Sequence, residues 1–391
     1  MRILAINGGA SGSSWNICKS ILEEAKNLGH EVYVATPDLN PGVETIDYYK
    51  IGTKFTRFIN RFITRIDGSD GFRNCSDTKK LINYIKLIKP DIVHLHTLHG
   101  YFINIKLLIE FLRKANIKVV ITCHDCWWFT GRCAHFTHQG CNNWKSGCGK
   151  CKFKKVYPRT IFSHKEKKYF LIKQKLFSDY RNLTVVCVSN WLSKLCRESL
   201  IFKDSKVITV YNGVDQDAFY LGEHKNMTNK AKIISVASQW NESKGLDLIV
   251  ELCSFFPLYS FIVVGKMKLK RMPKNLINIS YLKSKKDLAD LYRSCNALLN
   301  VSRQETFSLV NIEAQLCGTP VICYAETGMK ETISPSSFPI NDYNVEAFSN
   351  AIKRMLKSDI NRNLISKFAQ TFSLQQMNQS YLNIYGGDYS E

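Results

Sequence analysis

The chain has 391 residues, 45% hydrophobic and 22% charged, which is typical of a globular protein with two or three domains and excludes a disordered or fibrous one. No run of about 18 apolar residues is present, and the N-terminal residues do not resemble a secretion signal, so neither a spanning helix nor export is predicted. Lys and Arg exceed Asp and Glu by 21, and residues 1–220 hold 34 basic and 18 acidic side chains. The first half should therefore attract phosphates, anionic lipid or nucleic acid.

Short β-branched runs alternate with helical stretches in two series. The first series comprises 2–7, 31–36, 91–96, 118–123, 184–189 and 206–211, and the second comprises 232–237, 260–265, 297–302 and 320–325. Continuous apolar runs indicate strands buried on both faces of a parallel sheet. The pattern predicts an α/β fold with two doubly wound domains facing a cleft, because ligands bind at the carboxyl ends of such strands.

The predicted N-terminal domain covers residues 1–220, and the predicted C-terminal domain covers residues 221–372. The polar stretch 222–230 would link them. The tail at 373–387 has apolar residues at helical spacing and predicts an amphipathic helix.

A glycine- and serine-rich loop follows the first predicted strand and opens a helix. Its free backbone amides and the positive end of the helix dipole suit a phosphate. A tight turn without a ligand explains the pattern equally well. The candidate phosphate contacts are Gly8, Gly9, Ser11, Gly12 and Ser13.

The segment 54–66 predicts a helix with one apolar and one cationic face. The apolar face carries Phe55, Phe58, Ile59, Phe62, Ile63 and Ile66. The opposite face carries Lys54, Arg57, Arg61 and Arg65. This pattern is typical of a helix lying on an anionic membrane surface. The alternative is a helix that packs its apolar face on its own domain.

Histidines cluster at the ends of two neighbouring predicted strands. His94, His96 and His99 follow one of them, and the pair His124-Asp125 follows the other. Polar groups at the carboxyl end of a parallel sheet can orient a substrate or act as acid or base. We expect these residues to have a functional role.

Six of the fourteen cysteines lie between residues 123 and 151, in a segment that we call the cysteine-rich insertion, predicted at 123–153. Four thiolates could bind one structural Zn²⁺ tetrahedrally. Two disulfides or packed, reduced thiols are the alternatives, and a redox role is less favoured because the Cys-x-x-Cys pair does not open a helix. The candidate zinc ligands are Cys133, Cys141, Cys148 and Cys151.

The second half carries a basic residue and two carboxylates after predicted strands. Lys244 follows one strand and can reach a diphosphate. Glu305 lies in a loop and Glu313 lies inside the helix that follows it, where carboxylates can accept hydrogen bonds from sugar diols. Backbone amides of the intervening loop can hold phosphate at the start of the helix. These amides belong to Thr306, Phe307, Ser308 and Leu309.

The Glu305-x₇-Glu313 spacing, the CGTPVI run after it, SQWNESKG (238–245), YNGVD (211–215) and the first loop together resemble retaining GT-B glycosyltransferases of family 4. DIVHLHTLHGYFIN, TCHDCWWFTGRCAHF and GCGKCKF narrow the resemblance to the branch that builds bacterial exopolysaccharide, colanic-acid and capsular repeats. The resemblance covers nearly the whole chain.

The resemblance implies a role for each matching position. His124 would lie near O6 of the transferred sugar, and Lys244 would bind the donor diphosphate. Glu305 would hold the donor sugar, Glu313 the ribose diol, and residues 8–13 the phosphates. The terminal helix would pack back on the first domain.

Two positions depart from the family pattern. Gln239 stands where many relatives carry Arg, so Arg303 or Lys266 would help Lys244 meet the diphosphate charge. Ser308 stands where relatives often have Gly, which would narrow the phosphate loop.

The expected reaction moves a sugar from a UDP- or GDP-sugar to a lipid-linked saccharide with retained configuration, by a same-face displacement that needs no catalytic metal. The enzyme would act at the inner face of the cytoplasmic membrane, with His94, His96, His99 and Asp125 on the acceptor side. The alternatives are another GT-B enzyme, such as a sugar-nucleotide epimerase or a hydrolase, and a basic nucleic-acid-binding protein. No nucleic-acid module is recognisable, so a nucleic-acid partner is not expected.

Overall fold

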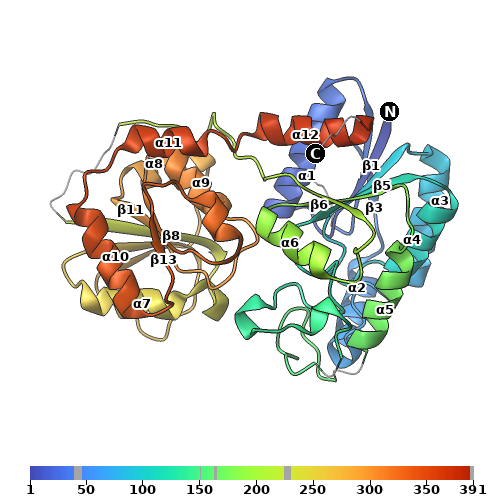
Figure 1. The fold of residues 1–391 in the computed structure, drawn as a ribbon, viewed down its shortest axis with the longest axis horizontal. Helices are drawn as coiled ribbons and strands as arrows, with labels where there is room; N and C mark the ends of the chain where they lie inside the picture. The colour runs from blue at the N-terminus through green and yellow to red at the C-terminus, as the bar shows by residue number, and fades with distance from the viewer. Residues whose placement is uncertain (39–45, 150, 163–164, 224–229, 388–391) are drawn as a thin grey trace. The chain divides into compact units, whose positions relative to one another are not determined.

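The computed structural model describes residues 1–38, 46–149, 151–162, 165–223 and 230–387. The chain divides into two compact units, and each is described by itself. The first unit consists of Met1–Tyr211 and Asn378–Glu391, and the second consists of Asn212–Met377 (Figure 1).

The division between the units comes earlier than the boundary predicted at residue 220. The segment after Tyr211 contacts the second unit, because Val214 pairs with Ser373 and Arg293 Nη1 donates to the Tyr220 carbonyl at 3.0 Å. Most of the predicted linker, residues 224–229, lies outside the described residues.

The first unit is built on a parallel sheet of seven strands in the order β3-β2-β1-β4-β5-β6-β7. Its central strands are buried on both faces, as their continuous apolar runs predict. The strands are β1 (Arg2–Ile6), β2 (Glu31–Thr36), β3 (Asp47–Lys50), β4 (Ile92–Leu95), β5 (Lys118–Cys123), β6 (Leu183–Cys187) and β7 (Lys206–Thr209).

Helices connect these strands, and α3, α4 and α5 pack side by side along one face of the sheet (Figure 1). The helices of the first unit begin with α1 (Ser13–Asn27), α2 (Lys54–Asp67), α3 (Cys75–Ile88) and α4 (Ile105–Lys114), followed by the short turns η1 (Thr137–Gln139) and η2 (Asn143–Lys145), then α5 (Glu166–Phe177) and α6 (Asn190–Glu198).

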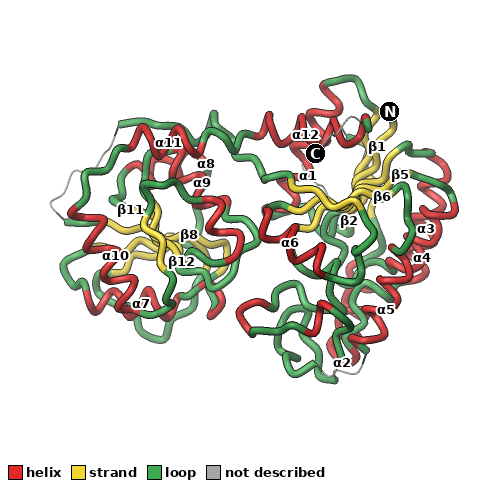
Figure 2. The backbone as a smooth tube through the Cα atoms, viewed as in Figure 1, coloured by secondary structure: helices red, strands yellow, loops and turns green. Residues whose placement is uncertain are grey.

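The second unit has a parallel sheet of six strands in the order β10-β9-β8-β11-β12-β13. The strands are β8 (Lys232–Gln239), β9 (Ser260–Lys266), β10 (Leu276–Ile279), β11 (Ala297–Asn300), β12 (Val321–Tyr324) and β13 (Phe338–Ile340). The helices are η3 (Glu242–Lys244), α7 (Leu246–Phe255), α8 (Lys285–Arg293), α9 (Leu309–Leu316), η4 (Thr327–Thr332), α10 (Val345–Lys357) and α11 (Arg362–Ala369). Strands flanked by helices in each unit (Figure 2) confirm the prediction of two doubly wound parallel-sheet domains.

Three strands escaped the sequence prediction: β3, β10 and β13. All three lie at sheet edges, where only one neighbour pairs with them and the burial is incomplete. Edge strands need no continuous apolar run, so their short sequences carry little signal.

The terminal helix α12 (Leu374–Gly386) brings its second half into the first unit. Tyr381 and Tyr385 are buried there, and Asn378 exchanges hydrogen bonds with Ser20 of α1. None of the helices within the described residues has the length and apolar character needed to cross a bilayer.

Candidate active site

In the second unit, Lys244 and Glu305 form a close ion pair. Lys244 ends the turn η3, whose first turn is capped by the side chain of Asn241. Glu305 lies between β11 and α9, so both residues follow the carboxyl ends of parallel strands. Both side chains keep partial exposure, at 32% for Lys244 and 21% for Glu305, so a ligand can reach the pair.

The loop that carries Glu305 is fixed through Thr327. The Thr327 hydroxyl donates to the Glu305 carbonyl at 2.8 Å and accepts from the Glu305 amide at 3.2 Å, and the Gly328 amide donates to the same carbonyl at 3.0 Å. These bonds hold the backbone of Glu305 and leave its carboxylate to Lys244.

Glu313 lies one turn into α9, as the sequence predicts, and its carboxylate accepts a hydrogen bond from Tyr292 Oη at 3.2 Å. Burial raises the pKa of Glu313 to about 7, although the Tyr292 hydroxyl and the charge of Lys285 oppose the rise. The carboxylate is therefore partly protonated at neutral pH in the free protein. A ligand that donates hydrogen bonds to the ionised form would favour ionisation.

Ser308 precedes α9, but its hydroxyl does not cap the helix. The Asn300 side-chain amide donates to Ser308 Oγ at 2.9 Å and to Asn311 Oδ1 at 2.9 Å. Buried bonds from Gln315 to the Asn311 and Thr332 carbonyls continue this network. The start of α9 is thus held rigidly without a side-chain cap on its first amides.

Gln239 and Lys266 are paired in register across β8 and β9. Arg303 points elsewhere, because its guanidinium lies over the Tyr343 ring at 4.1 Å and forms an ion pair with Asp247 at 3.2 Å. Of the two basic residues named as helpers of Lys244, Arg303 is thus already engaged by other partners.

In the first unit, the glycine-rich loop makes a close turn at the end of β1. A Cβ atom on Gly8 would lie 2.6 Å from the Thr97 carbonyl oxygen, so only glycine fits there. Asp38 accepts a hydrogen bond from the Ala10 amide at 3.0 Å and pairs with Arg57 at 2.6 Å. The Asp38 carboxylate therefore already accepts a hydrogen bond from the Ala10 amide, which lies within residues 8–13, the segment predicted to contact phosphates.

The histidines form a continuous chain of contacts behind His124. His124 Nε2 lies 3.0 Å from His96 Nδ1, and the His96 and His94 rings contact each other at a tilt of 37°, with centroids 4.0 Å apart. His94 Nδ1 lies 2.6 Å from Tyr385 Oη, and His94 Nε2 lies 2.8 Å from Thr122 Oγ1. His94 is fully buried with both nitrogens bonded inside the protein, so its place differs from the acceptor contact predicted for it.

The charge states of these histidines follow from their burial. Burial lowers the pKa of His94 to about 3, and His124 adds to that shift. Burial lowers the pKa of His124 to about 4, although the charge of Asp125 opposes the shift. His124 is therefore neutral at physiological pH. It can donate or accept a hydrogen bond, but it does not bring a positive charge.

The tautomer of His124 can be assigned from His96. His96 Nε2 is buried without a hydrogen-bond partner, and an unpaired buried N–H is rarer than an unpaired acceptor. His96 therefore carries its proton on Nδ1 and donates it to His124 Nε2. His124 then carries its own proton on Nδ1, where it acts as a donor.

His99 and Asp125 form a separate ion pair at 2.7 Å. Burial alone would lower the pKa of His99, but the Asp125 carboxylate and the charge of Asp70 outweigh it and raise the pKa above its usual value. Burial would raise the pKa of Asp125, but His99 lowers it to about 2. Tyr157 Oη lies 3.1 Å from His99 Nδ1, which fixes the ring from its other side.

The helix α2 leaves its apolar face uncovered. Phe55, Phe58 and Phe62 are 70%, 68% and 63% exposed, so the alternative that this face packs on its own domain does not hold. Exposed Ile161 and Phe162 extend the face, because their amides donate to the Arg65 and Ile66 carbonyls. We call the six exposed side chains the α2 patch: Phe55, Phe58, Ile59, Phe62, Ile161 and Phe162.

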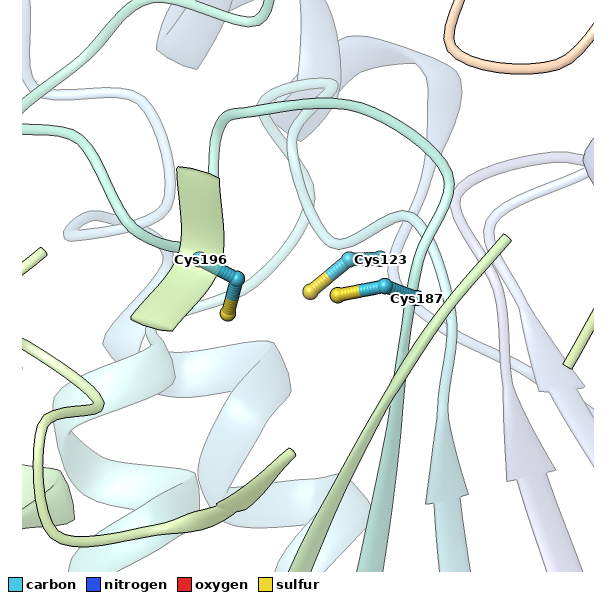
Figure 3. Close-up of side chains that lie close together, drawn as sticks. All are labelled: Cys123, Cys187 and Cys196. Carbon is cyan, nitrogen blue, oxygen red and sulfur yellow. The ribbon is translucent and has the colours of Figure 1, made fainter. Parts of the chain in front are cut away.

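The structure also places three thiols together that the sequence did not group. Cys123 and Cys187 are cross-strand partners at the ends of β5 and β6, and Cys196 faces them from α6 (Figure 3). Their sulfurs lie within 4.8 Å of one another and all three residues are buried. Within the described part of the chain, no other three metal-ligating atoms come this close, so the four predicted zinc ligands are not brought to that spacing.

Sequence reasoning missed several side chains that hold the site. Tyr381 and Tyr385 had a signal, since two tyrosines four residues apart share one helix face. Asp38, Tyr157 and Thr327 had none, because the first two lie in loops and Thr327 begins the short turn η4, whose positions the sequence does not reveal.

Two doubly wound parallel sheets in series are the architecture of GT-B glycosyltransferases, and family models show that this chain is one. The model of Glycosyltransferase Family 4 matches residues 15–218, and that of Glycosyl transferases group 1 matches residues 222–372. The chain belongs to glycosyltransferase family 4.

Relatives of known sequence or structure agree with this assignment. The chain is 25% identical over 411 residues to a putative colanic acid biosynthesis glycosyl transferase, WcaC of Escherichia coli K12, covering 98% of this chain and 99% of that one. Sucrose-phosphate synthase of Thermosynechococcus elongatus has a similar fold, with a TM-score of 0.72 at 14% identity over 99% of this chain and 98% of the other. Anabaena HepE, solved in complex with UDP-glucose, gives a TM-score of 0.67 at 14% identity over 99% and 100%.

Proposed function

We propose that this glycosyltransferase moves a sugar from a nucleotide diphospho-sugar to a lipid-linked saccharide in bacterial surface polysaccharide synthesis, with retained configuration. The observation that carries the proposal is the arrangement in the second unit, where the Lys244–Glu305 pair and Glu313 follow parallel strands around the uncapped start of α9. The similarity to a putative colanic acid enzyme over the whole chain supports the pathway. The UDP-glucose complex of a structural neighbour supports the donor class.

In the proposed donor complex, Lys244 and the first amides of α9 meet the diphosphate, and Glu313 accepts hydrogen bonds from both ribose hydroxyls. The Ser308 side chain is held away from these amides by Asn300, so it does not compete with a phosphate oxygen. Glu305 accepts from sugar hydroxyls while Lys244 shifts toward the phosphate.

Neither Glu305 nor Glu313 suits a covalent intermediate, since Glu305 is paired with Lys244 and Glu313 is held by Tyr292. We therefore propose a same-face displacement. The bond from the anomeric carbon to the leaving phosphate oxygen breaks, and a bond to the acceptor oxygen forms on the same face. The acceptor hydroxyl proton passes to the leaving phosphate, whose charge Lys244 and the α9 amides stabilise.

On the acceptor side, we propose that His124 donates from Nδ1 to the transferred sugar and that the His99–Asp125 pair borders the acceptor. His94 and His96 act as positioning residues, because their contacts end inside the protein at Tyr385 and Thr122.

The donor proposal predicts a pH-dependent affinity. A panel of UDP- and GDP-sugars should include one that raises the melting temperature, since a ligand specific to the folded state stabilises it. Because only ionised Glu313, with its pKa of about 7, accepts from both hydroxyls, we expect the dissociation constant of that donor to rise about tenfold from pH 8 to pH 6. Calorimetric titration at both pH values measures this rise.

The variant Glu313→Gln serves as the control for this measurement. It should bind the donor more weakly at pH 8 and show little change between pH 8 and pH 6. Equal pH dependence in both proteins would assign the titration to another group. Conversion of the donor without any acceptor would indicate an epimerase or a hydrolase.

We further propose that the α2 patch places the enzyme on the inner face of the cytoplasmic membrane. The patch combines exposed aromatic rings with Arg61 and Arg65 on the same helix, which suits an anionic bilayer. The net charge of +21 acts in the same direction.

Replacing Phe58 and Phe62 by aspartate should therefore abolish most binding to vesicles that contain phosphatidylglycerol. Each buried aromatic ring contributes about 1.5–3 kcal/mol, so we expect a loss of about 100-fold or more in the partition coefficient measured by co-sedimentation. Leu258→Asp is the matched control, because Leu258 is 74% exposed and lies in the second unit. Equal binding by both variants would contradict the proposal.

A further inference from the structure

The cysteine-rich insertion, residues 123–153, begins at the end of β5 and contains little regular structure after it. Its described residues form only the turns η1 and η2, and Figure 2 draws the rest as loop. Nevertheless Phe136 and Trp144 are buried in it, with ring centroids 4.9 Å apart. A long loop with so little helix or strand is stabilised when a further interaction ties its parts together.

The four cysteines Cys133, Cys141, Cys148 and Cys151 surround one small cavity. Its volume is about 30 Å³, and its other walls include Phe136, Trp144 and the buried Arg132–Glu166 ion pair. This volume matches the space of a single water molecule or ion. Four soft ligands from different parts of the insertion therefore line a space that one ion would fill.

Hydrogen-bond donors are already arranged around two of the sulfurs. The Gly131 amide donates to Cys148 Sγ at 3.2 Å, and Arg132 Nη2 lies 3.7 Å from Cys151 Sγ. Donors of this kind orient and stabilise metal-bound thiolates. The thiols of Cys133 and Cys151 are also in hydrogen-bond contact with each other.

Buried charge around the cavity points the same way. Lys173 is fully buried and donates to the Trp127 and Thr130 carbonyls at 2.5 and 3.0 Å, and Arg132 is also buried. Glu166 offsets the charge of Arg132, and the carboxylates of Asp125 and Asp70 act on Lys173. The Arg132 guanidinium, whose Nη2 lies 3.7 Å from Cys151 Sγ, can stabilise a thiolate there.

We propose that Cys133, Cys141, Cys148 and Cys151 bind one structural Zn²⁺ that holds the cysteine-rich insertion together. On binding, four S–H bonds are replaced by four Zn–S bonds and the protons pass to solvent, with no change of oxidation state. No three of these sulfurs lie within 4.8 Å of one another, whereas tetrahedral zinc requires about 3.8 Å, so the insertion contracts around the ion.

The proposal goes beyond the transfer reaction and does not depend on it. It has a consequence for the first unit, because Tyr157, which contacts His99, lies in the loop that directly follows the insertion. Zinc would therefore fix the loop that supports the His99–Asp125 pair.

The full chain, purified without added metal or chelator, should contain one zinc per molecule by native mass spectrometry and elemental analysis. Cobalt exchanged into it should give the absorption of a tetrahedral site with four thiolates. Cys148→Ser with Cys151→Ser should remove the metal, whereas Cys75→Ser, at an exposed thiol, should retain it. In the wild-type protein, chelation should increase hydrogen exchange of residues 131–153.

Three results would overturn the proposal. Protein that contains no zinc and also fails to take up cobalt would contradict the proposal directly. Loss of the metal in Cys187→Ser, with retention in the Cys148→Ser, Cys151→Ser protein, would move the site to the buried trio of Figure 3. A denatured mass lower by the hydrogens of two disulfides would show that the four thiols are oxidised in pairs.

Discussion

Lys244→Ala should lower turnover at saturating donor by about 100- to 1000-fold. Lys244 follows β8 in the turn η3, and its ammonium group pairs with Glu305 in the free protein. In the proposed reaction, negative charge grows on the leaving diphosphate as the glycosidic bond forms. Loss of one preorganised donor aimed at such a charge typically costs this much in rate.

The effect on turnover should exceed the effect on donor affinity. In the free enzyme, Lys244 is already neutralised by Glu305, so part of its attraction for the ground-state diphosphate is spent on separating that pair. Steady-state kinetics with a radiolabelled or mass-resolved product separates the two parameters.

Lys353→Ala provides the comparison for overall charge, since Lys353 is exposed on α10 in the same unit. It should retain full turnover. If Lys244→Ala were as active as Lys353→Ala, the assignment of the donor site to the second unit would have no support.

The central strands of both sheets could be predicted because burial on two faces demands continuous apolar runs. β4 and β11, for example, read IVHL and ALLN and are buried throughout. The edge strand β3, with the sequence DYYK, is only partly buried and gave no such run. A continuous apolar run therefore indicates a buried strand, and strands whose burial is incomplete are not detected in this way.

The donor residues could be placed because they follow strands directly, as Lys244 and Glu305 do. The residues that contact the predicted site residues of the first unit could not be foreseen in the same way. Asp38, which follows the neighbouring strand β2, contacts the glycine-rich loop, and Tyr385 reaches His94 from a position 291 residues away in the chain. Such contacts depend on tertiary packing and not on local sequence.

The α2 patch shows how structure adds to a sequence pattern that has two interpretations. An amphipathic helix with three phenylalanines fits a packed helix and a membrane-binding helix equally well. The exposure of Phe55, Phe58 and Phe62 removes the first of these. The sequence alone does not give this exposure, because it does not show whether other residues pack on the apolar face of the helix.

His124→Ala should lower kcat/KM by about 100-fold. His124 is neutral, with its pKa lowered to about 4 by burial, and His96 holds its Nε2 at 3.0 Å. A neutral donor at Nδ1 can bind a sugar hydroxyl that shifts in the transition state, and loss of a buried hydrogen bond of this kind costs about 1–3 kcal/mol. His30→Ala, at the amino end of β2, should keep wild-type activity.

Two further variants test which nitrogen of His124 makes the contact. An asparagine amide replaces Nδ1 in space and a glutamine amide replaces Nε2, so His124→Asn should recover part of the activity and His124→Gln should not. The same assignment predicts that His124 contributes no break to the pH profile between pH 6 and pH 8, since its pKa lies near 4. Nitrogen chemical shifts of the imidazole report the tautomer directly. Recovery by glutamine, with the proton found on Nε2, would reverse the hydrogen bond to His96 and place an unpaired N–H at His96 Nε2 inside the protein.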